Sequence, residues 1–134
     1  MSELVLIDTS TWICFFARKG FNEVKKVVSL LLDDDRAAIS GPVLLELVQG
    51  VRTEKEKGDI QDLIKGLHWL TVSDTHWHKA ADLAFKMRRK GVTTSGVDTI
   101  IATLAIEYEC LLLHRDSDYE MIAKHSSLRC YKYI

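Results

Sequence analysis

The 134-residue chain lacks several features that would assign it to a specialised class of protein. It has only three cysteines, an odd number without CxxC spacing, which argues against a disulfide framework or a zinc knuckle and favours reduced thiols in the cytoplasm. No apolar run approaches the roughly 20 residues that cross a bilayer, and the first residues lack the basic start of a secretory signal. A net charge of −1 differs from the strongly basic balance typical of proteins that coat nucleic acid.

The overall composition of the chain is that of a globular protein. Hydrophobic residues make up 47% of the chain, and the length suits one domain with a buried core, so we expect a single domain over residues 1–134. The sequence contains no repeat, linker or low-complexity segment that would divide it.

Short apolar segments alternate with helical patterns along the chain. We expect strands at 4–7, 37–39, 69–72, 111–113 and 128–133, and helices at 10–18, 22–32, 42–50, 54–67, 74–89, 97–108 and 117–124. Because strands that alternate with helices need crossover connections, the pattern predicts an α/β fold with a mostly parallel central sheet and helices on both faces.

Four acidic residues occupy positions that such a fold would bring together. Asp8 and Asp116 follow apolar strands, Asp98 begins an apolar helix, and Glu46 lies in the helix after the second strand. Ligands bind beyond the carboxyl ends of parallel strands, and carboxylates that meet there would repel one another without a cation. The pattern therefore indicates a hard metal ion and phosphate chemistry, with the Ser10 hydroxyl available to join the metal shell or hold a water.

Each acid taken alone also fits an ordinary structural role. Asp8 could cap a helix, and Asp98 could be a first-turn acid that complements the helix dipole. Glu46 could face water, while Asp116 and Asp118 could be turn residues. The joint pattern favours a shared site, because all of them fall at a strand–helix junction or in a helix leading to or from one.

Four short motifs carry a resemblance that covers essentially the whole chain: IDTS at 7–10, PVLLELVQG at 42–50, DTIIATLA at 98–105 and LLHRDSDY at 112–119. In this order they resemble the PIN-domain ribonucleases, and within them the VapC-type toxins of toxin–antitoxin pairs. One departure is His114, where a Thr or Ser is more usual in that family.

The resemblance implies a Mg²⁺- or Mn²⁺-dependent endoribonuclease that is dimeric and inhibited by a cognate antitoxin. It implies that metal-activated water hydrolyses RNA phosphodiesters, and that the acidic residues carry the catalysis and hold the metal. By position in the motifs these residues are Asp8, Glu46, Asp98 and Asp116, with Ser10 and Asp118 as supporting candidates.

Basic residues near the acids, and two other classes of protein, offer further interpretations of the sequence. Arg115 is expected to contact RNA because it adjoins the acidic pocket, whereas the basic run at 86–90 fits either a solvated helix end or a phosphate-binding rim. A haloacid-dehalogenase-type phosphatase would place a second aspartate where Ser10 stands. The remaining alternative is a PIN-like module that binds RNA or protein without cutting, whose signature would be a missing acid.

Overall fold

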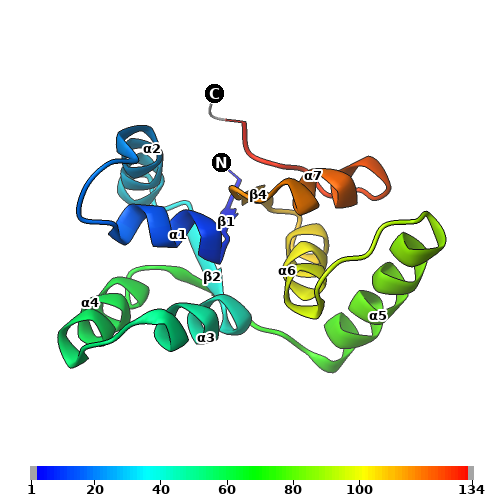
Figure 1. Ribbon diagram of the computed structural model, residues 1–134, viewed down its shortest axis with the longest axis horizontal. Helices are drawn as coiled ribbons and strands as arrows, with labels where there is room; N and C mark the ends of the chain where they lie inside the picture. The colour runs from blue at the N-terminus through cyan, green and yellow to red at the C-terminus, as the bar shows by residue number, and fades with distance from the viewer. Residues whose placement is uncertain (1–2, 133–134) are drawn as a thin grey trace.

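Four parallel strands form the centre of the molecule. The computed structural model describes residues 3–132 and contains β1 (Val5–Ile7), β2 (Ala37–Ser40), β3 (His68–Leu70) and β4 (Leu111–Leu113), in the order β3-β2-β1-β4. Every paired neighbour runs parallel, and helices pack on both sides of the sheet (Figure 1). The structure confirms the predicted α/β fold.

Seven helices connect and cover the strands within residues 3–132. They are α1 (Thr9–Phe16), α2 (Asn22–Asp33), α3 (Gly41–Gly50), α4 (Glu54–Ile64), α5 (Asp74–Arg89), α6 (Gly96–Glu107) and α7 (Ser117–Lys124). Figure 1 shows α1 to α4 on one side of the sheet and α5 to α7 on the other. Within the described part of the chain, no helix is long and apolar enough to cross a bilayer.

The predicted helices are all present, with small differences at their ends. Helix α1 ends at Phe16, before the predicted residue 18, because the backbone is extended at Ala17 and then turns through Gly20 at a φ of 81°. A positive φ of this kind suits glycine, which has no Cβ to clash. Helix α4 ends at Ile64, before the predicted residue 67, and β3 correspondingly begins at His68 and not at residue 69.

The prediction of a last strand at 128–133 was wrong for the described residues 128–132. Here the chain makes only an isolated parallel bridge between Cys130 and Leu112. The Leu112 N–H donates to the Arg129 carbonyl at 2.9 Å, and its carbonyl accepts from the Tyr131 N–H at 2.8 Å. Because alternate residues of a strand face each neighbour and β4 has three residues, only Leu112 offers both groups to this side. Residue 133 lies outside the described residues.

The core joins the strands to one helix that is buried on nearly all sides. All three residues of β1 are fully buried, as expected for a central strand covered on both faces. In α6, every residue from Thr99 to Ala105 is buried, which confirms the prediction that this helix is internal. Its two buried threonines satisfy their hydroxyls within the helix, since Thr99 donates to the Ser95 carbonyl and Thr103 to the Thr99 carbonyl.

The strand order creates a crevice at one edge of the sheet. From β1 the chain proceeds outward through β2 to β3, and then returns to place β4 on the other side of β1. Adjacent parallel strands whose connections leave in opposite directions separate at their carboxyl ends, and this is where open α/β sheets bind ligands. Ile7 and Leu113 are register partners at this point, so the residues that follow them begin side by side.

Candidate metal centre

Asp8 is held at the end of β1 by a set of hydrogen bonds. It caps α1, and its Oδ2 accepts from the Ser10 backbone N–H at 3.1 Å and from the Ser10 hydroxyl at 2.7 Å. The Ser10 hydroxyl in turn accepts from the backbone N–H of Arg115 at 3.0 Å. Ser10 therefore orients the carboxylate and also ties the end of β1 to the loop after β4.

Tyr119 joins two of the acids through its phenol group. Its hydroxyl lies 2.8 Å from Asp8 Oδ1 and 3.1 Å from Asp98 Oδ1, and the side chain is completely buried. Burial and the two nearby negative charges raise the pKa of Tyr119 far above its ordinary value, so the phenol keeps its proton. A protonated phenol donates hydrogen bonds but carries no charge, so it neutralises neither of the two carboxylates when they are ionised.

Asp98 extends toward this centre from the first turn of α6. Ser95 caps the helix by accepting the Asp98 backbone N–H at 3.0 Å. Partial burial raises the pKa of the Asp98 carboxyl, and the negative charges of Asp8 and Asp116 raise it further, while hydrogen bonds from Tyr119 and Ser95 act in the opposite direction. The raised pKa shows that the fold disfavours a negative charge at this position when nothing neutralises it.

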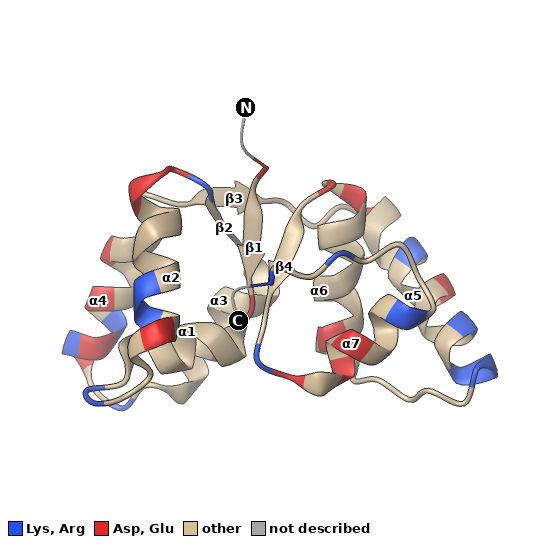
Figure 2. Ribbon diagram, turned by 90° about the horizontal axis from the view of Figure 1, so that it is seen from above, with Lys and Arg blue, Asp and Glu red and all other residues tan. Residues whose placement is uncertain are grey.

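Two further aspartates complete the acidic cluster. Asp116 caps α7, and its Oδ1 accepts the backbone N–H of Asp118 at 2.9 Å. One carboxylate oxygen from each of Asp98, Asp116 and Asp118 can be chosen so that all lie within 4.8 Å of one another. Figure 2 shows acidic segments close together on α6 and α7. These oxygens come from two segments of the sequence, the starts of α6 and α7, which the fold brings together.

Glu46 reaches the same region through a different contact. It lies on α3 and is half-buried, and its Oε1 accepts a hydrogen bond from the Thr9 hydroxyl at 2.7 Å. Thr9 directly follows Asp8, so the hydrogen bond fixes the Glu46 carboxylate beside the end of β1. The plain interpretation that Glu46 simply faces water does not describe this geometry.

Side-chain contacts hold His114 and Arg115, the two residues before Asp116, in place. The Arg115 Nη1 lies 3.0 Å from the Cys14 sulfur, and the guanidinium lies over the Phe21 ring at 5.1 Å. The His114 Nδ1 accepts the backbone N–H of Asp116 at 3.1 Å. His114 thus supplies the acceptor for the backbone of the acidic loop at the position where the resemblance leads one to expect Thr or Ser.

The structure gathers most of the predicted site residues in one place. Asp8 and Asp98 share the Tyr119 hydroxyl, Asp98 adjoins Asp116 and Asp118, and Ser10 braces Asp8. Glu46 adjoins this cluster through Thr9, whereas the Arg115 side chain is directed toward α1 and the segment before α2. Its contact with RNA stays a prediction.

Sequence reasoning missed Tyr119 and Thr9. A tyrosine in a short amphipathic helix ordinarily signals core packing, and the ring of Tyr119 does pack in the core. The available signal was its position three residues after Asp116, which turns the side chain back over the first turn of α7. Thr9 was already present in the motif that contains Asp8, but its contact with a residue 37 positions away depends on the tertiary fold.

The donor set suits a hard divalent cation. All of the converging groups are oxygen ligands, which Mg²⁺ and Mn²⁺ prefer. After burial, the negative charges of Asp8 and Asp116 raise the pKa of Asp98, and the neutral phenol between Asp8 and Asp98 does not offset those charges. A cation held by Asp8, Asp98 and Asp116 would offset them.

Comparison with known proteins agrees with the fold. Residues 5–125 match the PIN domain family. The chain is 32% identical over 129 residues to Ribonuclease VapC11 of Mycobacterium tuberculosis, covering 94% of this chain and 96% of the relative. The chain therefore belongs to the PIN-domain family, in its VapC branch.

Solved structures show the same architecture at lower sequence identity. The crystal structure of VapBC2 from Rickettsia felis bound to a DNA fragment from their promoter aligns with a TM-score of 0.80 and 16% identity, over 98% of this chain and 99% of that chain. DNA-bound VapBC from Salmonella typhimurium aligns with a TM-score of 0.80 and 18% identity, over 99% and 100%. At these identities the likeness concerns the fold.

Proposed function

We propose that this protein is a metal-dependent endoribonuclease that hydrolyses RNA phosphodiesters. One observation carries the proposal: the Tyr119 hydroxyl lies within hydrogen-bond distance of both Asp8 and Asp98, and an Asp98 oxygen lies within 4.8 Å of oxygens from Asp116 and Asp118. Such a site attracts a divalent cation, and a bound cation makes the site attractive to phosphate. The name of the mycobacterial relative, a ribonuclease, supports RNA as the substrate.

The residues that would hold Mg²⁺ or Mn²⁺ are Asp8, Asp98 and Asp116, with Asp118 able to bind directly or through water. A divalent ion in such a site supplies charge neutralisation for the phosphate and activation of water. Mg²⁺ retains several waters when protein carboxylates bind it, so a sparse set of aspartates around an open crevice suits it.

The protein's own residues would orient the groups that react. Ser10 and Tyr119 fix both oxygens of Asp8. Thr9 fixes one oxygen of Glu46, which leaves the other free to take a proton from an attacking water. Arg115 directly precedes Asp116, and its cation, which lies against Cys14 and Phe21, would attract the phosphate backbone of RNA.

We also propose that the chain is a single-domain toxin that forms a homodimer in the cytoplasm and is inhibited by an antitoxin. The similar structures from Rickettsia felis and Salmonella typhimurium are VapBC complexes. Exposed apolar side chains support contacts with protein partners. One group lies on α1 and α2 and in the segment between them, and it contains Ile13, Phe16, Phe21 and Leu30.

A second apolar surface lies beside Glu46. It is a groove of about 620 Å³ between α3, α5 and α6, lined by residues that include Leu45, Trp77 and Val97. All three of these side chains are exposed. We propose that one of these apolar surfaces binds a second copy of the chain and the other binds the antitoxin.

The activity is tested by incubating the purified chain with RNA in Mg²⁺, in Mn²⁺ and in EDTA. We expect cleavage with either ion and none in EDTA, and we expect Asp116→Asn to lose cleavage. The matched control is Asp74→Asn, which removes a first-turn acid from α5 and should cleave as the parent does. Full activity in EDTA would disprove the metal-dependent mechanism.

The biological role is tested by expression. The chain alone should slow growth, and co-expression of a cognate antitoxin should restore it. Asp116→Asn should be harmless in the same strain. A chain that cleaves RNA in vitro, leaves growth unchanged and remains monomeric would contradict the toxin assignment and leave the ribonuclease proposal intact.

A further inference from the structure

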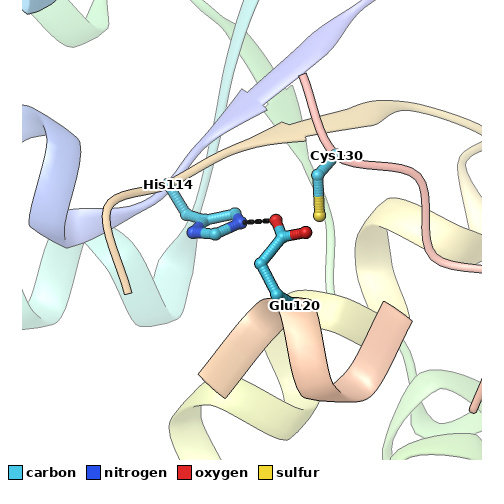
Figure 3. Close-up of side chains that lie close together, drawn as sticks. All are labelled: His114, Glu120 and Cys130. Carbon is cyan, nitrogen blue, oxygen red and sulfur yellow. Dashed lines mark hydrogen bonds and ion pairs between the residues drawn. The ribbon is translucent and has the colours of Figure 1, made fainter. Parts of the chain in front are cut away.

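A second cluster of metal-ligand atoms adjoins the acidic cluster. His114 follows β4, Glu120 lies in α7, and Cys130 forms the bridge to Leu112 (Figure 3). One nitrogen, one carboxylate oxygen and one sulfur from these residues all lie within 4.8 Å of one another. The three side chains point toward a common centre, as Figure 3 shows.

Hydrogen bonds hold this cluster together. The His114 Nε2 lies 2.8 Å from Glu120 Oε2. Because Nδ1 accepts from the Asp116 backbone, the ring carries its proton on Nε2 and donates it to Glu120. Hydrogen bonds with His114 and then with Cys130 hold the pKa of Glu120 below its ordinary value. Burial and the neighbouring Glu120 raise the pKa of Cys130 to about 12, so the thiol keeps its proton as well.

We propose that His114, Glu120 and Cys130 bind one Zn²⁺ ion, and that this ion opposes metal binding at the acidic cluster. Zn²⁺ accepts imidazole nitrogen, thiolate sulfur and carboxylate oxygen as ligands and leaves a fourth position for water. Mg²⁺ does not favour thiolate. The two neighbouring clusters therefore differ in ligand chemistry, one containing only oxygen and the other nitrogen, sulfur and oxygen.

The ion takes the place of two hydrogens that now point at Glu120. The Cys130 thiol releases its proton to solvent and becomes the thiolate ligand. The imidazole stays neutral, but its proton moves from Nε2 to Nδ1, since Nε2 must offer its lone pair to the metal. The charge balance is then one Zn²⁺ against one thiolate and one carboxylate.

This proton movement links the two clusters. With a proton on Nδ1, the His114 ring can no longer accept the backbone N–H of Asp116, so two donors face each other. Asp116 caps α7 and belongs to the acidic cluster, and its loop must shift. Zinc at His114 therefore weakens binding of Mg²⁺ or Mn²⁺, and each metal weakens the other by the same factor. This link rests on the proposed function, whereas zinc binding itself does not.

The surroundings allow an ion to enter. The Glu120 side chain is 44% exposed, so the cluster opens to solvent through it. Lys132 lies 3.4 Å from Glu120 and is the neighbouring cation that would repel the metal, but its side chain is 77% exposed and can move into water. The Tyr119 ring packs beside the His114 ring, with 5.0 Å between the ring centroids.

Cobalt absorption tests the ligand set on the full-length reduced protein. One equivalent of Co²⁺ should produce a sulfur-to-cobalt charge-transfer band, and Zn²⁺ should abolish the band with the same stoichiometry. The band should disappear in Cys130→Ser and weaken in His114→Thr, which introduces a residue usual in the resembled family. It should persist in Cys110→Ala, which removes a different buried thiol. No band in the parent, or an equal band in Cys130→Ser, would overturn the proposal.

Manganese affinity tests the link, measured by electron paramagnetic resonance with and without one equivalent of Zn²⁺. The parent should bind Mn²⁺ about fivefold or more weakly when zinc is present, and Cys130→Ser should show no such change. An equal loss of affinity in Cys130→Ser would place the zinc in the acidic cluster and refute the proposal. Unchanged Mn²⁺ affinity in zinc-loaded parent would refute it as well. Because neither measurement uses RNA, failure of the ribonuclease proposal would be seen separately.

Discussion

The exchange of Asp98 for Asn separates a metal site from an ordinary helix-capping acid. Asn keeps the shape of the side chain and can still accept from the Tyr119 hydroxyl, but it removes one negative charge from the cluster. If Asp98 served only the dipole of α6, its loss would destabilise the protein by about 0.3–1 kcal/mol. If Asp98 is one of several crowded carboxylates, its removal should stabilise the metal-free protein.

The distances between the carboxylates set the size of their electrostatic repulsion. Two carboxylate charges within 4.8 Å repel by roughly 3 kcal/mol at an effective dielectric constant of about 20. Asp98 is only partly buried, so water and salt reduce this to about 1–2 kcal/mol. After the lost dipole interaction, we expect Asp98→Asn to gain about 0.5–1 kcal/mol in EDTA at neutral pH, or a few degrees in Tm.

The pH dependence of this gain follows from the sign of the pKa shift. The fold raises the pKa of Asp98, mainly through burial and then through Asp8 and Asp116. Well below the ordinary aspartate pKa the side chain is neutral in both folded and unfolded states, so parent and variant should be similarly stable there. As the pH rises through the raised pKa, the metal-free parent should lose stability relative to the variant.

Thermal melts in EDTA and in Mg²⁺, together with one RNA cleavage assay, test this reasoning. Mg²⁺ should stabilise the parent by mass action and the variant less, and only the parent should cleave. Asp74→Asn should show the small loss expected of a first-turn acid and keep full cleavage. An Asp98→Asn protein that melts lower in EDTA and still cuts RNA would show that Asp98 is an ordinary first-turn acid and holds no metal.

Three further outcomes follow from the contacts around the site. Tyr119→Phe should lose about 2 kcal/mol of stability in EDTA, because the buried Asp8 carboxylate no longer accepts a hydrogen bond from the Tyr119 hydroxyl. Thermal melts in Mg²⁺ should recover part of this loss. Equal stability of parent and variant in EDTA would contradict the role of Tyr119 as a bridge between Asp8 and Asp98. Thr9→Val should keep the melting temperature within a few degrees of the parent's and lower the rate of RNA cleavage about tenfold, because the Glu46 carboxylate loses the hydrogen bond from the Thr9 hydroxyl. An unchanged cleavage rate would show that Glu46 takes no part in the mechanism. RNA cut in Mg²⁺ should carry 5′-phosphate and 3′-hydroxyl ends, since water attacks, whereas cyclic 2′,3′-phosphate ends detected by end-group analysis would indicate attack by the ribose hydroxyl.

Most of the fold could be predicted from the sequence, because its signals are local. Apolar runs such as 4–7 and 111–113 indicate buried strands, and residues such as Ser95 mark where helices begin. The error at 128–133 has a tertiary cause: how far this segment pairs depends on how many groups the three-residue β4 offers on its outer side. No property of the segment itself carries that information.

In the candidate site, too, some residues could be predicted from the sequence and others could be identified only from the structure. The acids were found because each lies at a strand–helix junction or in a helix beside one, and the topology predicts where such junctions meet. Tyr119 and Thr9 were missed because their roles depend on side-chain contacts across 111 and 37 residues of sequence. Likewise, His114 stood out as unusual in the sequence, but only the structure shows that its ring lies between the Asp116 backbone and Glu120.

The most direct test of the acidic centre is an anomalous difference map from crystals of the protein grown with Mn²⁺. We expect a peak at coordination distance from the carboxylates of Asp8, Asp98 and Asp116, with Glu46 close enough to reach a water beside the ion. A map with no peak there, at a Mn²⁺ concentration that supports RNA cleavage, would contradict the proposed metal site.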